Sequence, residues 1–440
     1  MIHVVGLIKI LRYSIRMDNF QIMHRILMIA FHYPPFQGGS GVHRTLKFSR
    51  YLPDNGWLPI ILTANPRAYT RVGGDRLCEI PTVVHVKRAF SLDTARHLSI
   101  YGSYISWMAI PDQWITWWVG GVLEGLRLIR KYRPRIIWST YPIATSNLIG
   151  LTLSRLTGIP WVVDLRDPMV DEVYPEEHIK RRSYKWIEEK ATTYASCLIF
   201  TTRSTRQMYL NRYPKLSHSR CMVISNGYDE EDFRHIKPLK RISRHNDHTV
   251  RLLHNGLIYR DYRDPKPFFR AFSRLKNEGQ VDGKNLRIDL RASGSEDYYS
   301  AMIRELGIDD LVHFLPALPF HEALEDCYNA DALILFQDTS CNHQIPAKVY
   351  EYLRLQKPIL ALTDYSGDTA QLLRETGGAT ILDLADDKIL YRFLPEFVNK
   401  VRHATHTLPD TAKIKLYRRK NQASELAKCL SRVVLPEVNI

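Results

Sequence analysis

The apolar run Ile26-Leu27-Met28-Ile29-Ala30 decides the fold, because it leads directly into the turn-rich loop His32-Tyr33-Pro34-Pro35-Phe36-Gln37-Gly38-Gly39-Ser40-Gly41. A short apolar run that ends at prolines and glycines predicts a buried strand and its turn. A helical pattern of apolar residues then continues to Leu52, Asn55-Gly56 ends it, and residues 59–63 are predicted as the next strand. Such a strand–helix–strand unit predicts a parallel sheet with a right-handed crossover.

The same alternation continues along the chain. Further strands are predicted at 135–139, 161–164 and 197–201, separated by helices at 119–131, 146–157 and 184–194. A polar, basic stretch follows Phe233, and the pattern then restarts with strands at 250–254, 286–290, 312–314, 332–336 and 358–362 and helices from 267 and over 298–306. We therefore expect an α/β protein with two doubly wound, Rossmann-like domains that face each other across a cleft, with ligands at the carboxyl ends of the strands.

The predicted domain boundaries follow this pattern. Residues 24–235 form the first domain, 236–248 a linker, 249–400 the second domain and 401–440 a C-terminal segment with a helix over 413–433. Residues 1–23 form an N-terminal extension. This extension is either an amphipathic interfacial segment or a stretch upstream of a natural start at Met17 or Met23.

Composition excludes several classes of protein. A chain of 440 residues with 45% apolar and 24% charged residues is neither a disordered tail nor a disulfide-rich mini-protein. Its six cysteines are scattered without a CxxC pair, which predicts a reducing compartment and no structural zinc. The longest apolar stretch, 105–123, is interrupted by Pro111 and Asp112, so no spanning helix is expected. The net charge of +15 favours an acidic lipid surface or a phosphate-bearing substrate over nucleic acid, for which no binding motif is present.

Two groups of residues in the first domain are candidates for chemistry. Gly38-Gly39 lies between a strand and a helix, where bare backbone N–H groups bind an anion or simply form a tight turn. The run Asp164-Leu165-Arg166-Asp167-Pro168 places two carboxylates and a guanidinium at the end of a central strand. Asp164, Arg166 and Asp167 are therefore candidate catalytic residues, with a structural ion pair as the alternative.

The second domain holds the more informative stretch, Ile345-Pro346-Ala347-Lys348-Val349-Tyr350-Glu351. Pro346 opens a helix, so the amides at Ala347 and Lys348 point outward as an anion site to which Lys348 adds a cation. Glu351 lies one turn further, where a carboxylate accepts hydrogen bonds from a diol such as ribose.

From about Arg25 to Asp387 the sequence resembles the retaining GT-B glycosyltransferases, and family 4 in particular. The residues that carry the resemblance are, in order, Tyr33-Pro34-Pro35 with Gly38-Gly39, Ile110-Pro111-Asp112, 160–168, 224–229 with Phe233, 256–271, Gly294, and Lys348 with Glu351 and 357–360. The most similar subgroup serves bacterial polysaccharide and lipid-linked glycan assembly. The resemblance implies a nucleotide diphosphate-sugar donor bound mainly by the second domain, a glycan or lipid-linked acceptor at the first, and neither cofactor nor metal.

The resemblance also assigns donor-site residues, with two departures. Glu351 matches the second glutamate of the family's Glu-x7-Glu motif, whereas His343 stands at the first, which puts the contact with the donor sugar in doubt. Arg263 matches the lysine that holds the diphosphate, and Arg260 substitutes for an arginine whose position holds Leu257. Arg166 stands where other members carry a histidine. The donor-binding set is completed by Gly38, Gly39, Gly256, Gly294 and Ala347, and the acidic pair Asp386-Asp387 is predicted to be a solvated turn and not a metal site.

Other hypotheses remain open. The chain is alternatively an inactive GT-B-like scaffold subunit of a glycan assembly complex, which the histidine at position 343 would favour, or a nucleotide-sugar 2-epimerase. The expected location is the cytoplasm, peripheral to the inner face of the membrane. Contact with an anionic leaflet would use the dispersed positive charge and the tryptophans at 107, 114, 117 and 118, unless these tryptophans belong to the core.

Overall fold

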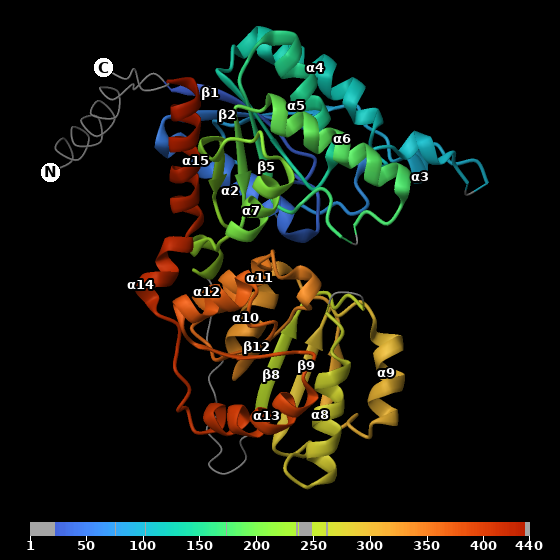
Figure 1. Ribbon diagram of the computed structural model, residues 1–440, viewed down its shortest axis with the longest axis vertical. Helices are drawn as coiled ribbons and strands as arrows, with labels where there is room; N and C mark the ends of the chain where they lie inside the picture. The colour runs from blue at the N-terminus through green and yellow to red at the C-terminus, as the bar shows by residue number, and fades with distance from the viewer. Residues whose placement is uncertain are drawn as a thin grey trace, which may run out of the picture. The chain divides into compact units, whose positions relative to one another are not determined.

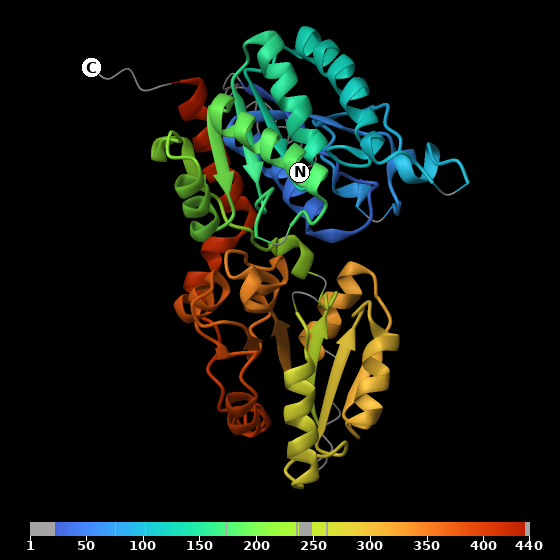
Figure 2. The same cartoon turned by 45° about the vertical axis from the view of Figure 1, so that its right-hand side comes forward.

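The computed structural model describes residues 23–74, 76–101, 103–172, 174–234, 236, 249–260 and 263–435. The N-terminal extension before Met23 and nearly all of the predicted linker lie outside these residues. The chain forms two compact units (Figures 1 and 2). Unit 1 comprises 1–200, 210–222 and 423–440, and unit 2 comprises 201–209 and 223–422.

Unit 1 is built on a seven-stranded sheet in the order β3-β2-β1-β4-β5-β6-β7. The pairs from β3 to β6 are parallel. The strands are β1(His24–Ile29), β2(Trp57–Ala64), β3(His85–Ala89), β4(Ile136–Thr140), β5(Trp161–Leu165), β6(Cys197–Phe200) and β7(Cys221–Val223). The predicted strand at 26–30 is β1, whose last four residues are fully buried.

Helices cover this sheet, and α4, α5 and α6 lie side by side on it (Figure 1). The helices are α2(Gly39–Tyr51), α3(Thr94–His97), α4(Thr116–Tyr132), α5(Ala144–Thr157), α6(His178–Tyr194), α7(Arg203–Arg212), which passes from unit 2 into unit 1, and α15(Arg419–Val434), most of which belongs to unit 1. A close approach fixes α5 against the sheet. A Cβ atom on Gly150 would lie 2.5 Å from Nε1 of buried Trp161, so only glycine fits at this position.

A buried ion pair ties α2 to β5. Both Nε and Nη2 of Arg44 donate to the carboxylate of Asp164, at 2.9 and 2.8 Å, and Thr140 Oγ1 donates to the same carboxylate at 3.0 Å. The side chains of Arg44 and Asp164 are completely inaccessible to solvent. The pairing joins residues 120 positions apart and holds the helix that follows the first loop against the centre of the sheet.

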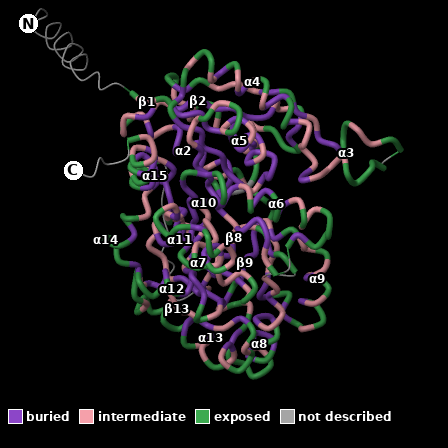
Figure 3. Tube along the Cα trace, turned by 45° about the horizontal axis from the view of Figure 1, so that its top comes forward, coloured by how far each residue is buried: buried purple, intermediate pink, exposed green. Residues whose placement is uncertain are grey.

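Unit 2 has a six-stranded parallel sheet in the order β10-β9-β8-β11-β12-β13. Its strands are β8(Val250–Asn255), β9(Leu286–Arg291), β10(Val312–Leu315), β11(Ala332–Phe336), β12(Ile359–Leu362) and β13(Ala379–Leu382). Its helices are α8(Lys266–Asn277), α9(Glu296–Glu305), α10(Phe320–Asn329), α11(Ala347–Arg354), α12(Asp368–Thr376), α13(Asp387–Arg402) and α14(Thr411–Ile414). Figure 3 shows the central strands of this unit among the buried residues.

The two Rossmann-like units confirm the predicted fold class, and several local features differ from the prediction. Strands β3, β7 and β13 were not predicted, because they are short and only partly buried and lack a long continuous apolar run. Asp386-Asp387 is not a solvated turn: the Asp386 side chain accepts hydrogen bonds from the backbone N–H groups of Lys388 and Ile389 and caps α13. The predicted helix at 413–433 divides into α14, a short 3₁₀ segment and α15.

The boundaries of the two units also differ from those of the predicted domains. Residues 201–209 and 223–234 belong to unit 2, although the sequence placed them in the first domain, and most of the C-terminal helix returns to unit 1. Within the described residues, no helix is both long enough and apolar enough to cross a bilayer.

We predict that Asp164→Asn destabilises the protein by about 3–5 kcal/mol, because it removes the negative charge that pairs with the buried Arg44 guanidinium. Chemical denaturation measures the loss. Glu425→Gln is the control, since it removes an exposed partner of Lys428 and should cost under about 1 kcal/mol. Equal effects of the two substitutions would contradict the structural importance of the buried pair.

Candidate functional site

The site lies at the carboxyl edge of the second sheet, where the strand order reverses. Strands β8 and β11 are neighbours there, although five elements separate them along the chain. The loop after β8 begins at Gly256, and the loop after β11 leads to Ala347, the first residue of α11. In doubly wound sheets this switch point is the usual place for a ligand.

Gly256 allows Lys348 to pack against the end of β8. Its backbone has φ +114°, a conformation that favours glycine, and a Cβ atom there would lie 2.9 Å from Nζ of Lys348. The lysine amine therefore occupies the space that a side chain at position 256 would need. Tyr352, from the same helix, accepts a hydrogen bond from the backbone N–H of Asn255 at 3.0 Å and holds α11 beside this loop.

His254 lies beneath the lysine and is fully buried. Its Nδ1 is 3.0 Å from the carbonyl oxygen of Ile334, and its Nε2 is 3.3 Å from Nζ of Lys348. A carbonyl oxygen can only accept, so we assign the proton to Nδ1, which leaves Nε2 to accept from the lysine. Burial, together with the charge of Lys348, lowers the pKa of His254 well below its usual value and keeps the ring neutral.

The charge of Lys348 is itself destabilised. Burial, followed by the nearby positive charge of Arg263, lowers the pKa of Lys348 to about 7, whereas Glu351 and Cys327 act in the opposite direction. Arg263 lies near the ring of Tyr259, and its Nε is buried without a hydrogen-bond partner among the described residues. Lys348 and Arg263 repel each other, and nearby negative charge offsets their positive charge only in part. Such a pair of cations favours a multiply charged anion between them.

Other predicted donor residues have different surroundings. The guanidinium of Arg260 stacks on the ring of Tyr298, 3.9 Å from its centroid, and Arg260 is not among the charges that act on Lys348. The backbone N–H of Gly294 donates to Glu296 at 2.9 Å and is therefore already engaged. The carbonyl oxygen of His343 accepts from the hydroxyls of Thr202 and Thr205, at 2.7 and 2.8 Å, which fixes the loop before α11.

In unit 1, the predicted site residues are Asp164, Arg166 and Asp167 around the end of β5, and Gly38 and Gly39 at the start of α2. Asp164 is held by Arg44, as described above, and so has a structural role although it was a catalytic candidate. Arg166 lies beside His32: a Cβ atom on Gly41 would lie 3.0 Å from Nη1 of Arg166 and 2.6 Å from Nδ1 of His32.

Burial, followed by Arg166, lowers the pKa of His32 to about 3, while Asp167 and Asp164 offset part of the burial cost of Arg166. Gly38 and Gly39 begin α2, where the backbone N–H groups of its first turn have no helical partners.

The four tryptophans do not form one surface. Trp117 is completely buried, and Trp114 is partly buried and donates to the carbonyl oxygen of Ala68. Trp107 and Trp118 are exposed, to 70% and 37%. Trp117 therefore belongs to the hydrophobic core, whereas Trp107 does not.

Sequence reasoning missed two residues of the site, His254 and Tyr352. Both lie in apolar segments and are buried. A sequence pattern does not distinguish a buried functional residue from one that only packs in the core. The available signal was the position of His254, two residues before a glycine at the end of an apolar strand.

We predict that Lys348 titrates near pH 7 in the ligand-free protein, about three units below an ordinary lysine. Two-dimensional NMR of protein with ¹³C-labelled lysine side chains measures this directly. The resonance with the low midpoint should vanish in Lys348→Met and persist in Lys284→Met, which alters an exposed lysine of the same unit. Midpoints above pH 10 for every lysine would contradict the described environment.

Comparisons with known proteins agree with the fold. Residues 38–227 match the family described as glycosyl transferase 4-like domain. No curated protein sequence matches the chain.

Similar solved structures include sucrose-phosphate synthase from Thermosynechococcus elongatus, with 14% identity, a TM-score of 0.65 and coverage of 93% of this chain and 99% of that one. They also include HepE from Anabaena in complex with UDP and glucose, with 14% identity, a TM-score of 0.57 and coverage of 92% and 95%. WaaG, a glycosyltransferase involved in lipopolysaccharide biosynthesis, has 11% identity, a TM-score of 0.57 and coverage of 94% and 100%.

At these identities the structures establish the fold, and the family match covers most of unit 1. Residues 38–227 thus match a glycosyl transferase 4-like domain, and the two Rossmann-like units have the GT-B fold of the similar solved structures.

Proposed function

We propose that the protein transfers a sugar from a nucleotide diphosphate-sugar to an acceptor hydroxyl, with retention of the anomeric configuration. The observation that carries the proposal is the cluster of Lys348 and Arg263 at the switch point of the second sheet, beside the N-terminus of α11. A diphosphate supplies the multiple negative charges that such a cluster favours. The solved structures of HepE in complex with UDP and with UDP-glucose support a donor of this class.

The proposed chemistry follows from where charge develops. The bond between the anomeric carbon and the diphosphate oxygen breaks, and the electron pair leaves with the diphosphate. Lys348, Arg263 and the amide at Ala347 stabilise this growing charge, so the site favours the transition state over the bound donor. The acceptor oxygen bonds to the anomeric carbon, and its proton passes to the departing phosphate oxygen. Glu351 accepts from the ribose hydroxyls, and no step is assigned to a metal.

The acceptor is proposed to be a lipid-linked glycan at an anionic membrane surface. Residues 98–101 and 103–107 project from unit 1 beside α3 (Figures 1 and 3). Ile100 and Ser103 exchange two backbone hydrogen bonds there and form a tight turn. The side chains on this projection are apolar and exposed, namely Ile100 at 74%, Tyr101 fully, Tyr104 at 41%, Ile105 at 59% and Trp107 at 70%.

Positive charge lies at the base of this projection. Thr94 Oγ1 donates to the carbonyl oxygen of Met108 and anchors the projection to α3, and Arg96 donates to the carbonyl oxygen of Arg67. Arg67, Arg71 and Arg96 are exposed. Exposed aromatic and aliphatic side chains next to basic residues match the chemistry of an acidic lipid surface. Each cation near such a surface contributes about 1 kcal/mol to membrane binding.

Two alternatives predict different outcomes from the same protein. A nucleotide-sugar 2-epimerase would interconvert a free donor without an acceptor. An inactive scaffold subunit would bind the nucleotide without turnover. The family match over 38–227 favours transfer, since it describes a glycosyltransferase domain.

We predict that a nucleoside diphosphate from the set UDP, GDP and ADP raises the melting temperature of the full chain. Glu351→Gln should weaken its binding by about 1.5–3 kcal/mol, because a charged acceptor for ribose is lost. Arg263→Ala should weaken binding as well, whereas Arg260→Ala, which removes a guanidinium stacked on Tyr298, is the matched control. Calorimetry provides the affinities.

The same affinity should depend on pH through Lys348. Its lowered pKa leaves the amine neutral above about pH 7, so an anion must then bind together with a proton. Affinity should be constant below pH 7 and fall by about tenfold for each unit above it, and Lys348→Met should remove this dependence. Failure of all three diphosphates to bind would overturn the donor assignment.

We predict that the full chain sediments with vesicles of phosphatidylglycerol and not with vesicles of phosphatidylcholine, and that high salt releases it. The double substitution Ile105→Ser, Trp107→Ser should weaken binding, because two exposed apolar side chains no longer enter the interface. Leu408→Ser, at an apolar residue of unit 2 that is 53% exposed, is the control. Binding to neither vesicle, or equal losses in both variants, would exclude this membrane contact.

A further inference from the structure

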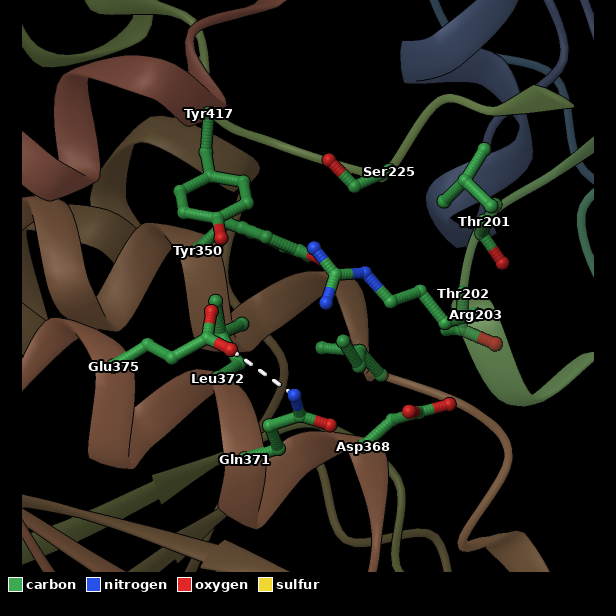
Figure 4. Close-up of a pocket in the computed structure, with 12 residues that line it drawn as sticks. Thr201, Thr202, Arg203, Ser225, Tyr350, Asp368, Gln371, Leu372, Glu375 and Tyr417 are labelled. Atoms are coloured by element: carbon green, nitrogen blue, oxygen red, sulfur yellow. Dashed lines mark hydrogen bonds between the residues drawn. The ribbon is translucent and has the colours of Figure 1, made fainter.

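A second pocket, of about 200 Å³, lies wholly within unit 2 (Figure 4). Its wall is formed by residues 201–203, Val223 at the end of β7, Ser225, Ile345, Tyr350 of α11, residues of α12, and Tyr417. None of the residues that surround Lys348 lines it. Tyr350 faces this pocket and Lys348 faces Gly256, as expected for residues two positions apart on a helix, which point to opposite sides.

An arginine occupies the middle of this pocket. Figure 4 shows the guanidinium of Arg203 reaching from the start of α7 between the tyrosine rings and the carboxylates. Among the described residues, Arg203 makes neither a hydrogen bond nor an ion pair. Its five N–H groups are therefore available to an acceptor that enters the pocket.

Two carboxylates face the same space. Oε1 of Glu375 accepts from Gln371 at 3.1 Å, which leaves its second oxygen available. Asp368 is 92% buried; its Oδ1 accepts from Ser204 at 2.9 Å, and its Oδ2 is buried without a hydrogen-bond partner among the described residues. A phosphate would meet these two negative charges, and an ammonium would meet Arg203.

A hydroxyl group satisfies both kinds of side chain, because it donates to a carboxylate and accepts from a guanidinium. Tyr350 and Tyr417 add two rings, whose centroids are 5.2 Å apart and whose planes are tilted by 46°. Burial and the charge of Glu375 raise the pKa of Tyr417, so its phenol remains a donor. The volume is below the roughly 300–1,000 Å³ of pockets for drug-sized ligands, which suits one ring and not a nucleotide.

We propose that this pocket binds a single sugar unit through its hydroxyl groups, apart from the donor site. Hydroxyls of the sugar accept from Arg203 and donate to Glu375 and Asp368, while its apolar face packs on Tyr417. The pocket does not use Lys348, Arg263 or Glu351, so the proposal is independent of nucleotide binding. The unit comes either from a free sugar or from a longer glycan.

Saturation-transfer NMR on the full chain tests the pocket, with the methyl glycosides of glucose, galactose, mannose and N-acetylglucosamine as probes. At least one glycoside should receive saturation. Arg203→Ala and Glu375→Gln should each weaken its binding by about tenfold, the effect of one charge-assisted hydrogen bond. Arg203 and Glu375 are exposed, so both variants should keep the melting temperature of the parent protein.

Matched controls separate this pocket from the donor site. Arg374→Ala removes an exposed arginine of α12 that does not line the pocket and should leave glycoside binding unchanged, as should Lys348→Ala. Tighter binding of a linear glucose trisaccharide than of the monosaccharide would indicate a glycan as the source, and equal binding a free sugar. The absence of saturation transfer to all four glycosides, equal signals in all variants, or displacement by inorganic phosphate would overturn the proposal.

Discussion

The second unit depends on the close approach of Lys348 to Gly256. Because position 256 has no side chain, the amine of α11 reaches the end of β8, where it contacts His254 and lies near Arg263. This environment penalises positive charge, which is why the pKa of Lys348 is low and His254 stays neutral. An anion relieves the penalty on both cations at once. In the proposed function, this packing of the cations favours the binding of a diphosphate.

In unit 1 a glycine also makes room for a charged side chain, but there the positive charges are paired with carboxylates. Gly41 gives His32 and Arg166 room beside α2, as Gly256 does for Lys348. The carboxylate of Asp164, however, pairs with Arg44, and Asp167 and Asp164 both act on Arg166. Charges at this edge are therefore largely balanced within the protein. The first sheet holds its loop and helix rigidly, whereas the second retains uncompensated positive charge for a ligand.

Exposed apolar groups and incompletely paired polar groups lie at the surfaces to which we assign partners. The projection of residues 98–101 and 103–107 exposes aliphatic and aromatic side chains that no described part of unit 1 covers, and the exposed Arg67 and Arg96 lie at its base. The pocket around Arg203 exposes a guanidinium and a carboxylate oxygen within a small volume. The first surface suits lipid and the second suits hydroxyl groups, because each offers the complementary chemistry.

Hydrophobic periodicity and glycine turns are local signals, so the alternation of strands and helices could be predicted from the sequence. The sequence also marked Lys348 and Glu351 as donor-site candidates, and the family resemblance added Gly256. The sequence alone did not predict which charged side chains contact one another. Asp164 pairs with Arg44, 120 residues away, and Lys348 contacts His254, 94 residues away. Arg260 and Arg263 look equivalent in the sequence, yet one stacks on Tyr298 and the other acts on Lys348. These roles follow from the folded structure, because burial and pairing arise from contacts between distant segments, and local sequence does not encode them.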